Sequence, residues 1–266
     1  MFKKALILIM ATSLTLLAYS DYDMDGVEDN IDKCPNTSFN ELVDIEGCTI
    51  KVLGNEHHFS IIYGIGLSEA DYATVKNSDT LTQSLQVDYY YQNFSLQAST
   101  SYYSSDEESG LNDTFIGAYY KLSPLNELTL RVGGGVLLPT YDTELENNNI
   151  DVVASASFSY MVEKINLFGG YSYTMVNDDD ILGIVSYQDT HSYSGGAGVH
   201  ASSNLYISGY YTISDSVYKD ADEIETLSLY SFYSIDTNWF TTFGYSHGLS
   251  DSASENSLTL RLGYYF

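Results

Sequence analysis

Apolar and polar residues alternate with a period of two along most of the chain, from His57 to Phe266. This period is typical of β-strands, in which successive side chains point to opposite faces. Apolar rows recur at residues 59–67, 85–91, 94–102, 116–122, 128–138, 152–160, 165–175, 193–199, 205–213, 227–235, 239–245 and 258–266. The pattern therefore predicts an all-β region of about twelve strands, an even number.

The faces opposite these rows carry serine, glycine, threonine and glutamine, as in the run Ser155, Ser157 and Ser159. Such residues are too small and polar for the dry core of a soluble sandwich or lectin, which is the alternative fold. No acidic or basic residue interrupts the middle of an apolar row. A lysine or arginine there would cost about 2–4 kcal/mol at the centre of a bilayer. We therefore expect residues 53–266 to form a transmembrane, antiparallel, up-and-down β-barrel whose apolar rows face lipid.

The connections between the predicted strands alternate in length. Short turns are expected at 92–93, 122–126, 162–164, 202–204 and 236–238, and long acidic loops at 104–113, 139–149, 176–190, 214–224 and 247–256. Outer-membrane barrels have short periplasmic turns and long external loops. With an even number of strands, both ends of the barrel segment then face the periplasm. The terminal Phe266 resembles the final aromatic residue by which the barrel-assembly machinery recognises such proteins.

The first twenty residues have the organisation of a secretory signal peptide. Lys3 and Lys4 precede an apolar run to Ala18 that is too short to span a bilayer as a helix. Ala18 and Ser20 occupy the −3 and −1 positions, which places cleavage before Asp21. Cleavage after Ala18 and an uncleaved anchor are the alternatives. We expect an exported protein of the outer membrane of a Gram-negative bacterium.

The formal net charge of −26 excludes nucleic acid as a partner and favours cations. The 26 tyrosines and 11 phenylalanines argue against a disordered acidic chain. Acidic clusters in the predicted loops, such as residues 178–180, are solvated tips or bind the divalent cations that bridge lipopolysaccharide phosphates. Outer-membrane lipid and lipopolysaccharide are thus the expected surroundings of the barrel.

Residues 21–32 carry acids at the spacing of an EF-hand loop, with Gly26 at the sharp turn. Alternating carboxylates of this kind converge on one hard cation, and the carbonyl of Val27 stands at the position of the backbone ligand. Shortly afterwards come the only two cysteines, Cys34 and Cys48. In an exported chain a disulfide between them is the default.

The stretch DYDMDGVEDNIDKCPNTSFNELVDIEGC resembles a thrombospondin type 3 repeat, in the form found as a linker in outer membrane protein A-like proteins. The resemblance rests on the spaced acids, the Cys34-Pro35 step, and Val43-Asp44 ahead of Gly47-Cys48. It implies a calcium-binding module over 21–52 with a Cys34–Cys48 bridge, on the periplasmic side. The implied calcium ligands are Asp21, Asp23, Asp25, Val27, Asp29 and Asp32. An acidic flexible tail is the alternative.

Four charged residues fall on the polar faces of predicted strands and hence inside the barrel: Asp88, Lys121, Arg131 and Arg261. Charges in such a place must pair or stay wet. We expect Asp88 to meet Arg261 across the first strand, and Glu127 to balance the other two cations. The cluster would then line a narrow pore for small ions or solutes, or form a plug that only stabilises the barrel. Further narrowing is expected from the inward tyrosines Tyr90, Tyr103, Tyr119, Tyr206, Tyr210 and Tyr230.

Residues suited to catalysis are few and lack a recognisable motif. His191 and Ser194 lie near Asp189, and His247 lies near Asp251. Nucleophilic catalysis needs a base held beside its nucleophile. We therefore expect a structural or narrow-pore protein rather than an enzyme. Adhesion through the acidic external loops and lipid modification by a barrel enzyme are the alternatives.

Overall fold

In the computed structural model the chain divides into two units, residues 1–54 and 55–266. The structure describes residues 32–34, 37, 46, 48, 57–70, 78–106, 108–141 and 148–266. The predicted signal peptide and all predicted calcium ligands except Asp32 lie outside these residues. Within the described ranges, no helix has the length and apolar character needed to cross a membrane.

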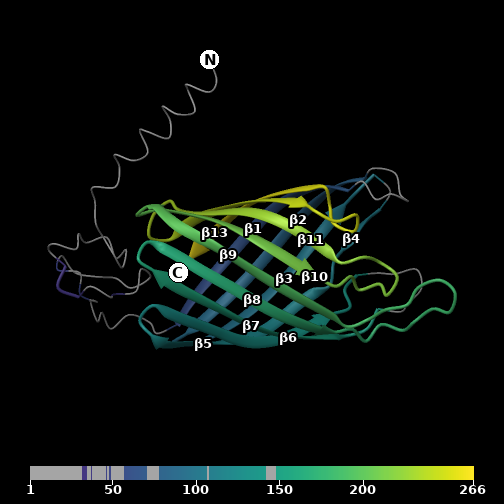
Figure 1. Cartoon of the computed structure of the whole chain (residues 1–266), viewed down its shortest axis with the longest axis horizontal. Helices are drawn as coiled ribbons and strands as arrows, with labels where there is room; N and C mark the ends of the chain where they lie inside the picture. Colours follow the sequence, from purple (N-terminus) through teal and green to yellow (C-terminus); the bar gives the residue numbers. More distant parts are fainter. Residues whose placement is uncertain are drawn as a thin grey trace, which may run out of the picture. The chain divides into compact units, whose positions relative to one another are not determined.

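The second unit consists of β-strands joined by turns and loops (Figure 1). The strands are β1 (His57–Ala70), β2 (Ser78–Tyr91), β3 (Phe94–Ser104), β4 (Ser109–Leu111), β5 (Thr114–Leu125), β6 (Leu128–Leu138), β7 (Asp151–Val162), β8 (Ile165–Met175), β9 (Thr190–Ser202), β10 (Leu205–Ser214), β11 (Ile224–Ser234), β12 (Trp239–Gly248) and β13 (Asn256–Tyr265).

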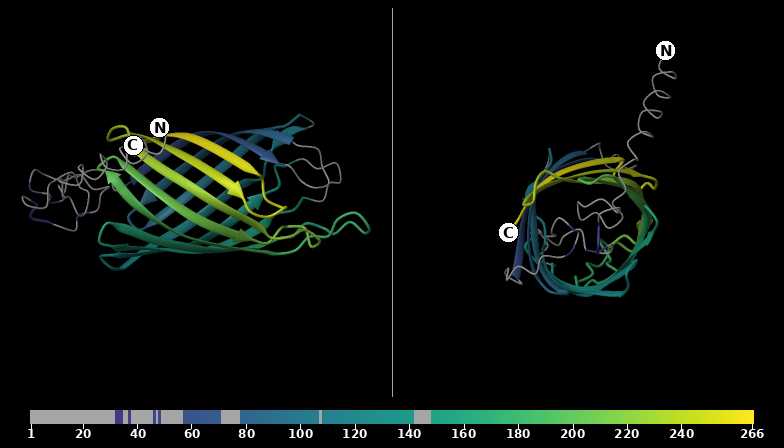
Figure 2. Two further views of the ribbon diagram at one scale, coloured as in Figure 1. Left: turned by 45° about the horizontal axis from the view of Figure 1, so that its top comes forward. Right: turned by 90° about the vertical axis from the view of Figure 1, so that its left-hand side faces the viewer.

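These strands close on themselves into a barrel. Each pairs antiparallel with its neighbour in the order β2-β1-β13-β12-β11-β10-β9-β8-β7-β6-β5-β3, and a β2–β3 pairing completes the ring. Seen end-on, the strands form a closed circle (Figure 2). The ring contains twelve strands, as the alternation predicted, because the three-residue β4 pairs with β3 alone. This short strand lies in a segment that we expected to be a loop.

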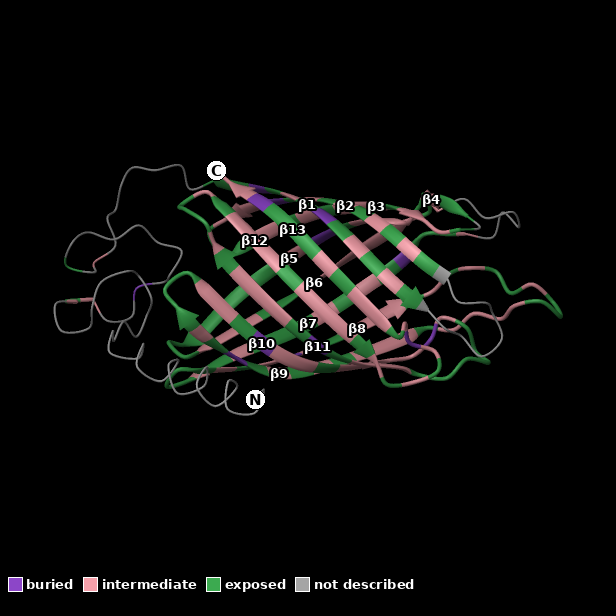
Figure 3. Ribbon diagram, turned by 90° about the horizontal axis from the view of Figure 1, so that it is seen from above, coloured by how far each residue is buried: buried purple, intermediate pink, exposed green. Residues whose placement is uncertain are grey.

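Exposure alternates along much of strands such as β3 and β7, and Figure 3 shows the alternation as bands. On β1, Ile61 is 44% exposed whereas the preceding Ser60 is 2% exposed. Leu260 of β13 reaches 57%. Among the described residues, Ala253 is the only buried apolar side chain, so this part of the chain has no dry core of the kind that a soluble sandwich needs. A continuous apolar outer surface on a closed barrel is stable in lipid rather than in water.

The two ends of the barrel differ, and Figure 1 shows the long loops gathered at one of them. Short turns join the strands at the other end. Four of them lie where they were expected, but the turn expected at 122–126 lies at 126–127, because β5 continues to Leu125. Two of the turns place Gln92 and Glu163 at positive φ, 49° and 54°. Positive φ is characteristic of tight hairpin turns whose twist matches that of the strands. At the end with the long loops, hydrogen bonds join the loops to one another and to the ends of neighbouring strands. Asp178 accepts one from the amide of Asn149 at 2.7 Å, and Asp215 accepts one from the amide of His191 at 2.9 Å.

Candidate functional site

The four predicted lumen charges lie on the face opposite the apolar rows. Asp88 is buried, with 5% exposure. Lys121, Arg131 and Arg261 are exposed. Their neighbours along the strand, such as Leu260, are apolar residues of the outer face, so the three cations point inward. Their strand parity is opposite to that of the apolar outer rows. The three cations therefore line the bore near the end that carries the short turns.

Asp88 is held by neutral donors from its own wall. The Ser60 hydroxyl donates to one carboxylate oxygen at 3.0 Å, and the Gln86 amide donates to both oxygens at 3.1 and 2.9 Å. The expected ion pair between Asp88 and Arg261 is wrong. On β1, Asp88 stands opposite Ser60 and Arg261 stands opposite Gly64. Four residues along a strand separate them by about 13 Å, beyond the reach of a direct contact.

Lys121 and Arg131 stand directly opposite each other on β5 and β6. The Arg131 guanidinium carbon lies 3.7 Å from the centroid of the Tyr119 ring. This is a cation–π contact, which positions a guanidinium without neutralising it. In the part of the chain that the structure describes, the ion pairs are Lys33–Glu46 and Lys219–Asp180. Balancing of the two cations by Glu127 was therefore a wrong expectation.

Arg261 lies along the wall beside a glycine. A Cβ atom at Gly64 would come within 2.9 Å of the Arg261 Cγ and within 2.5 Å of the Ser84 hydroxyl. A larger residue at position 64 would therefore displace the arginine. No described acid pairs with Arg261.

Two of the inward aromatic rings pack on glycines of the neighbouring strand. The Phe240 ring covers Gly263, where a Cβ would meet three ring carbons at 2.1–2.5 Å. Tyr119 packs in the same way on Gly133, its direct partner on β6. Aromatic packing on cross-strand glycines of this kind is a recognised device in β-barrels. At these two positions the small glycine leaves space for part of the ring of the residue opposite it.

The residues considered for catalysis are not brought together. His191 and Ser194 belong to the same strand, β9, but opposite parity places them on its two faces. The His191 ring contacts the Tyr171 hydroxyl at 2.9 Å, and Asp189 accepts hydrogen bonds from the Tyr173 hydroxyl and the Val176 amide. His247 contacts Asn256 at 3.3 Å. The hydrogen-bond partners of these two rings among the described residues are Tyr171 and Asn256, so neither ring is held beside a serine nucleophile.

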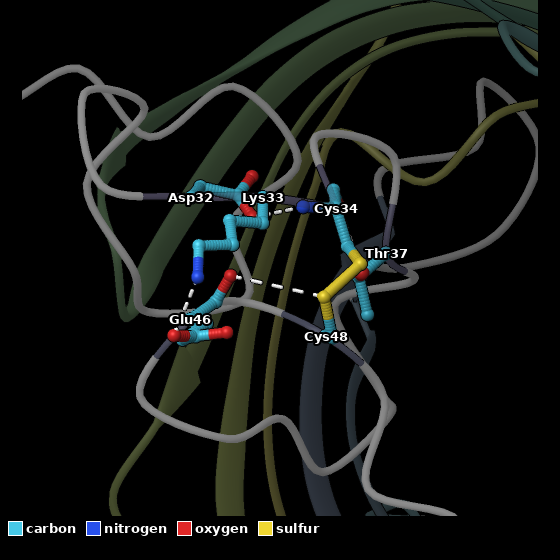
Figure 4. Close-up of a disulfide and its surroundings, with 6 residues drawn as sticks. All are labelled: Asp32, Lys33, Cys34, Thr37, Glu46 and Cys48. Carbon is cyan, nitrogen blue, oxygen red and sulfur yellow. Dashed lines mark hydrogen bonds and ion pairs between the residues drawn. A yellow bond between two sulfur atoms is a disulfide. The ribbon is translucent and has the colours of Figure 1, made fainter.

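The first unit contains the expected disulfide between Cys34 and Cys48, with the Cα atoms 5.0 Å apart (Figure 4). Lys33 pairs with Glu46 at 2.6 Å beside it. Asp32 Oδ1 accepts the Cys34 amide at 2.7 Å, whereas Asp32 Oδ2 is buried without a hydrogen-bond partner. A buried carboxylate oxygen without a donor is costly unless a cation binds it. Asp32 thus fits the ligand role that the sequence pattern predicts for it.

The sequence matches no protein-family model and no curated protein. Its fold is nevertheless similar to that of solved outer-membrane channels. An outer membrane channel from Pseudomonas putida F1 superposes with a TM-score of 0.63 at 16% identity, over 81% of this chain and 97% of that one. The NanC porin superposes with a TM-score of 0.56 at 14% identity, over 77% of this chain and 98% of that one. The KdgM porin superposes with a TM-score of 0.52 at 12% identity, over 78% of this chain and 99% of that one. The chain therefore has the fold of an outer-membrane channel barrel.

Proposed function

We propose that this protein is a narrow, passive channel of the outer membrane, with a calcium-binding module on its periplasmic side. One observation carries the proposal: Lys121, Arg131 and Arg261 face the bore, are exposed, and have no acidic partner among the described residues. A plug that only stabilised the barrel would pair or bury these cations, because an unpaired charge in a dry interior is strongly unfavourable. Their exposure supports a water-filled bore.

Two further observations support the same function. Inward rings such as Phe240 pack on glycines of the neighbouring strand, which lets them lie partly within the barrel wall. The apolar outer rows suit outer-membrane lipid, with lipopolysaccharide around the acidic loops, and the terminal Phe266 suits recognition by the barrel-assembly machinery. The solutes of such a channel are small ions or small polar molecules, and the barrel itself performs no chemical reaction.

Single-channel conductance of the refolded protein in planar bilayers tests the proposal. Ser157 is exposed, faces inward and stands opposite Arg131, whereas the next residue, Phe158, faces outward. Ser157→Trp should lower the unit conductance because it adds bulk to the bore, and Phe158→Trp should leave it unchanged. A correctly folded wild-type barrel that shows no conductance would refute the channel.

For the first unit we propose calcium binding by Asp32 together with Asp21, Asp23, Asp25, Asp29 and the Val27 carbonyl. When bound, the ion would neutralise these carboxylates and bring them together. The support is the buried, partnerless Asp32 Oδ2 and the bridge that begins two residues later. The Cys34 amide holds the other oxygen of Asp32 at 2.7 Å, which orients the carboxylate and leaves Oδ2 for the ion.

Isothermal titration of the full chain with calcium, in wild type and in Asp32→Asn, separates this site from weak binding by the acidic loops. The control is Glu41→Gln, an acid outside the proposed ligand set. One saturable site should be lost in Asp32→Asn and kept in the control. Extracellular calcium modules bind at about 10⁻⁴–10⁻³ M. Equal binding by all three proteins up to that range would contradict the proposal.

A second candidate function, surface interaction, is favoured by the tip of the loop 176–189. Leu182 is 101% exposed and Ile184 is 71% exposed, on either side of Gly183 with φ of 76°. Neighbouring apolar side chains that are fully exposed to solvent are a feature of protein–protein interaction sites. Cells that display the protein should aggregate less with Leu182→Ser and Ile184→Ser, measured by settling. Unchanged settling would remove this candidate.

A further inference from the structure

Lys121 and Arg131 are an unusual pair for a β-barrel wall. They are direct cross-strand partners, so their Cβ atoms lie about 5 Å apart, and like charges placed opposite each other destabilise a sheet. Neither has an acidic partner among the described residues, and both are exposed on the inner face. We infer that this pair is an anion-binding site in the lumen, which takes small solutes that carry a carboxylate or a phosphate. The inference rests on the proposed channel and names its solute class.

The balance of charge in this half of the bore is positive. Lys121, Arg131 and Arg261 are exposed, while the nearby acid Asp88 is 5% exposed and accepts hydrogen bonds from Ser60 and Gln86. Glu127, the acid that was expected to balance two of them, lies in the turn between β5 and β6 and makes no ion pair with them, so three cations stand against two acids. The negative charge is thus turned into the wall, and the positive charges are turned toward the solvent. A solute passing through the bore contacts the cations directly and the carboxylate only through its neighbours. This end of the lumen therefore attracts anions, although the chain as a whole carries a charge of −26.

The chemistry of the pair fits an oxyanion. Tyr119 lies beneath the Arg131 guanidinium at 3.7 Å and occupies one face of it, so the N–H groups around its edge stay available. A guanidinium edge binds carboxylate or phosphate through two parallel hydrogen bonds. The ammonium group of Lys121, reaching from the opposite strand, adds a second positive charge. The Tyr119 ring holds the Arg131 guanidinium in place without neutralising its charge, so the guanidinium can bind and release an anion.

The test measures the reversal potential of single channels in a potassium chloride gradient at low ionic strength. Low salt is chosen because exposed charges are screened over about 10 Å at 0.1 M. Wild type should be anion-selective, and the double change Lys121→Gln with Arg131→Gln should move the reversal potential to the cation-selective side. The control, Lys164→Gln with Lys219→Gln, removes two cations from a turn and an external loop and should remain anion-selective. Inorganic phosphate should reduce the chloride current in wild type and the control but not in the Lys121 and Arg131 variant.

The outcomes separate this inference from the channel itself. If wild type conducts but is cation-selective, or if the Lys121 and Arg131 variant keeps the wild-type reversal potential and the phosphate effect, the anion site is wrong and the channel stands. If no variant conducts, the channel is wrong. A variant whose β-sheet circular dichroism and heat-modifiable migration match wild type, but whose selectivity has reversed, confirms the assignment.

Discussion

A charge introduced on the outer face of the barrel should be far more costly than the same charge on the inner face. Ala98 and Ser99 are consecutive small residues in the middle of β3, and they point in opposite directions. Ala98 stands between Val87 and Ile116, which are 40% and 46% exposed on the outer surface. Ala98→Arg therefore puts a guanidinium among lipid-facing apolar residues, while Ser99→Arg puts it into the bore.

The magnitude follows from the depth of the site. An arginine facing lipid at the bilayer centre costs about 2–4 kcal/mol. That is about 1.5 to 3 powers of ten in the folding equilibrium. Equilibrium unfolding by denaturant in lipid vesicles measures the difference, with the fluorescence of the single tryptophan as the reporter. This residue, Trp239, packs edge-on against Tyr264 with ring centroids 4.8 Å apart. If Ala98→Arg were no less stable than Ser99→Arg, the assignment of the two faces would be wrong.

Three further predictions concern the ends of the chain and the loops. Thiol labelling of the unreduced protein should find no free cysteine, and reducing the Cys34–Cys48 bridge, which closes a loop with a sequence separation of 14, should cost the first unit about 3 kcal/mol. Hydrogen bonds from the Tyr173 hydroxyl and the Val176 amide lower the pKa of Asp189 below 3.8. These hydrogen bonds stabilise the folded protein above pH 3.8, and this stabilisation is lost as the pH falls through the lower pKa of the folded state. Tyr173→Phe removes one of them, so NMR titration should give a higher pKa for Asp189 in that variant. Phe266→Ser should reduce the heat-modifiable, folded fraction recovered from membranes, and an unchanged yield would show that the terminal ring has no part in assembly.

Local alternation was sufficient to predict which way each strand residue faces. Ser60, Asp88 and Arg131 lie on the expected side because a side chain's direction in a strand depends only on its parity. Four of the five short turns were also predictable, since their residues are polar and few. The strand β4 was not, because three residues with no apolar row carry no periodic signal and are ordered only by pairing with β3.

Contacts between strands that are distant in sequence could not be predicted from parity. Asp88 and Arg261 do lie on the two strands that neighbour β1, as expected. The expected ion pair also required them to lie at the same height along the barrel axis, and they do not. Their level depends on the stagger of the whole closed ring, a property of all twelve strands together. The contact of Tyr119 with Gly133 was missed for a different reason. Glycine was interpreted as a small polar lining, whereas its role is to make room for a ring on the next strand.

The pairing of β1 with β13 determines when the barrel becomes complete. Every other pairing in the ring joins strands that follow one another along the chain, apart from the step over β4, and hairpins of this kind form quickly. The remaining pairing joins the two ends, where Phe59 and Phe266 exchange backbone hydrogen bonds at 2.8 and 2.9 Å. Until β13 has paired with β1, two strand edges stay open, and open edges in lipid leave backbone groups unsatisfied. Closure is therefore a late, single event that a chain truncated before β13 cannot complete.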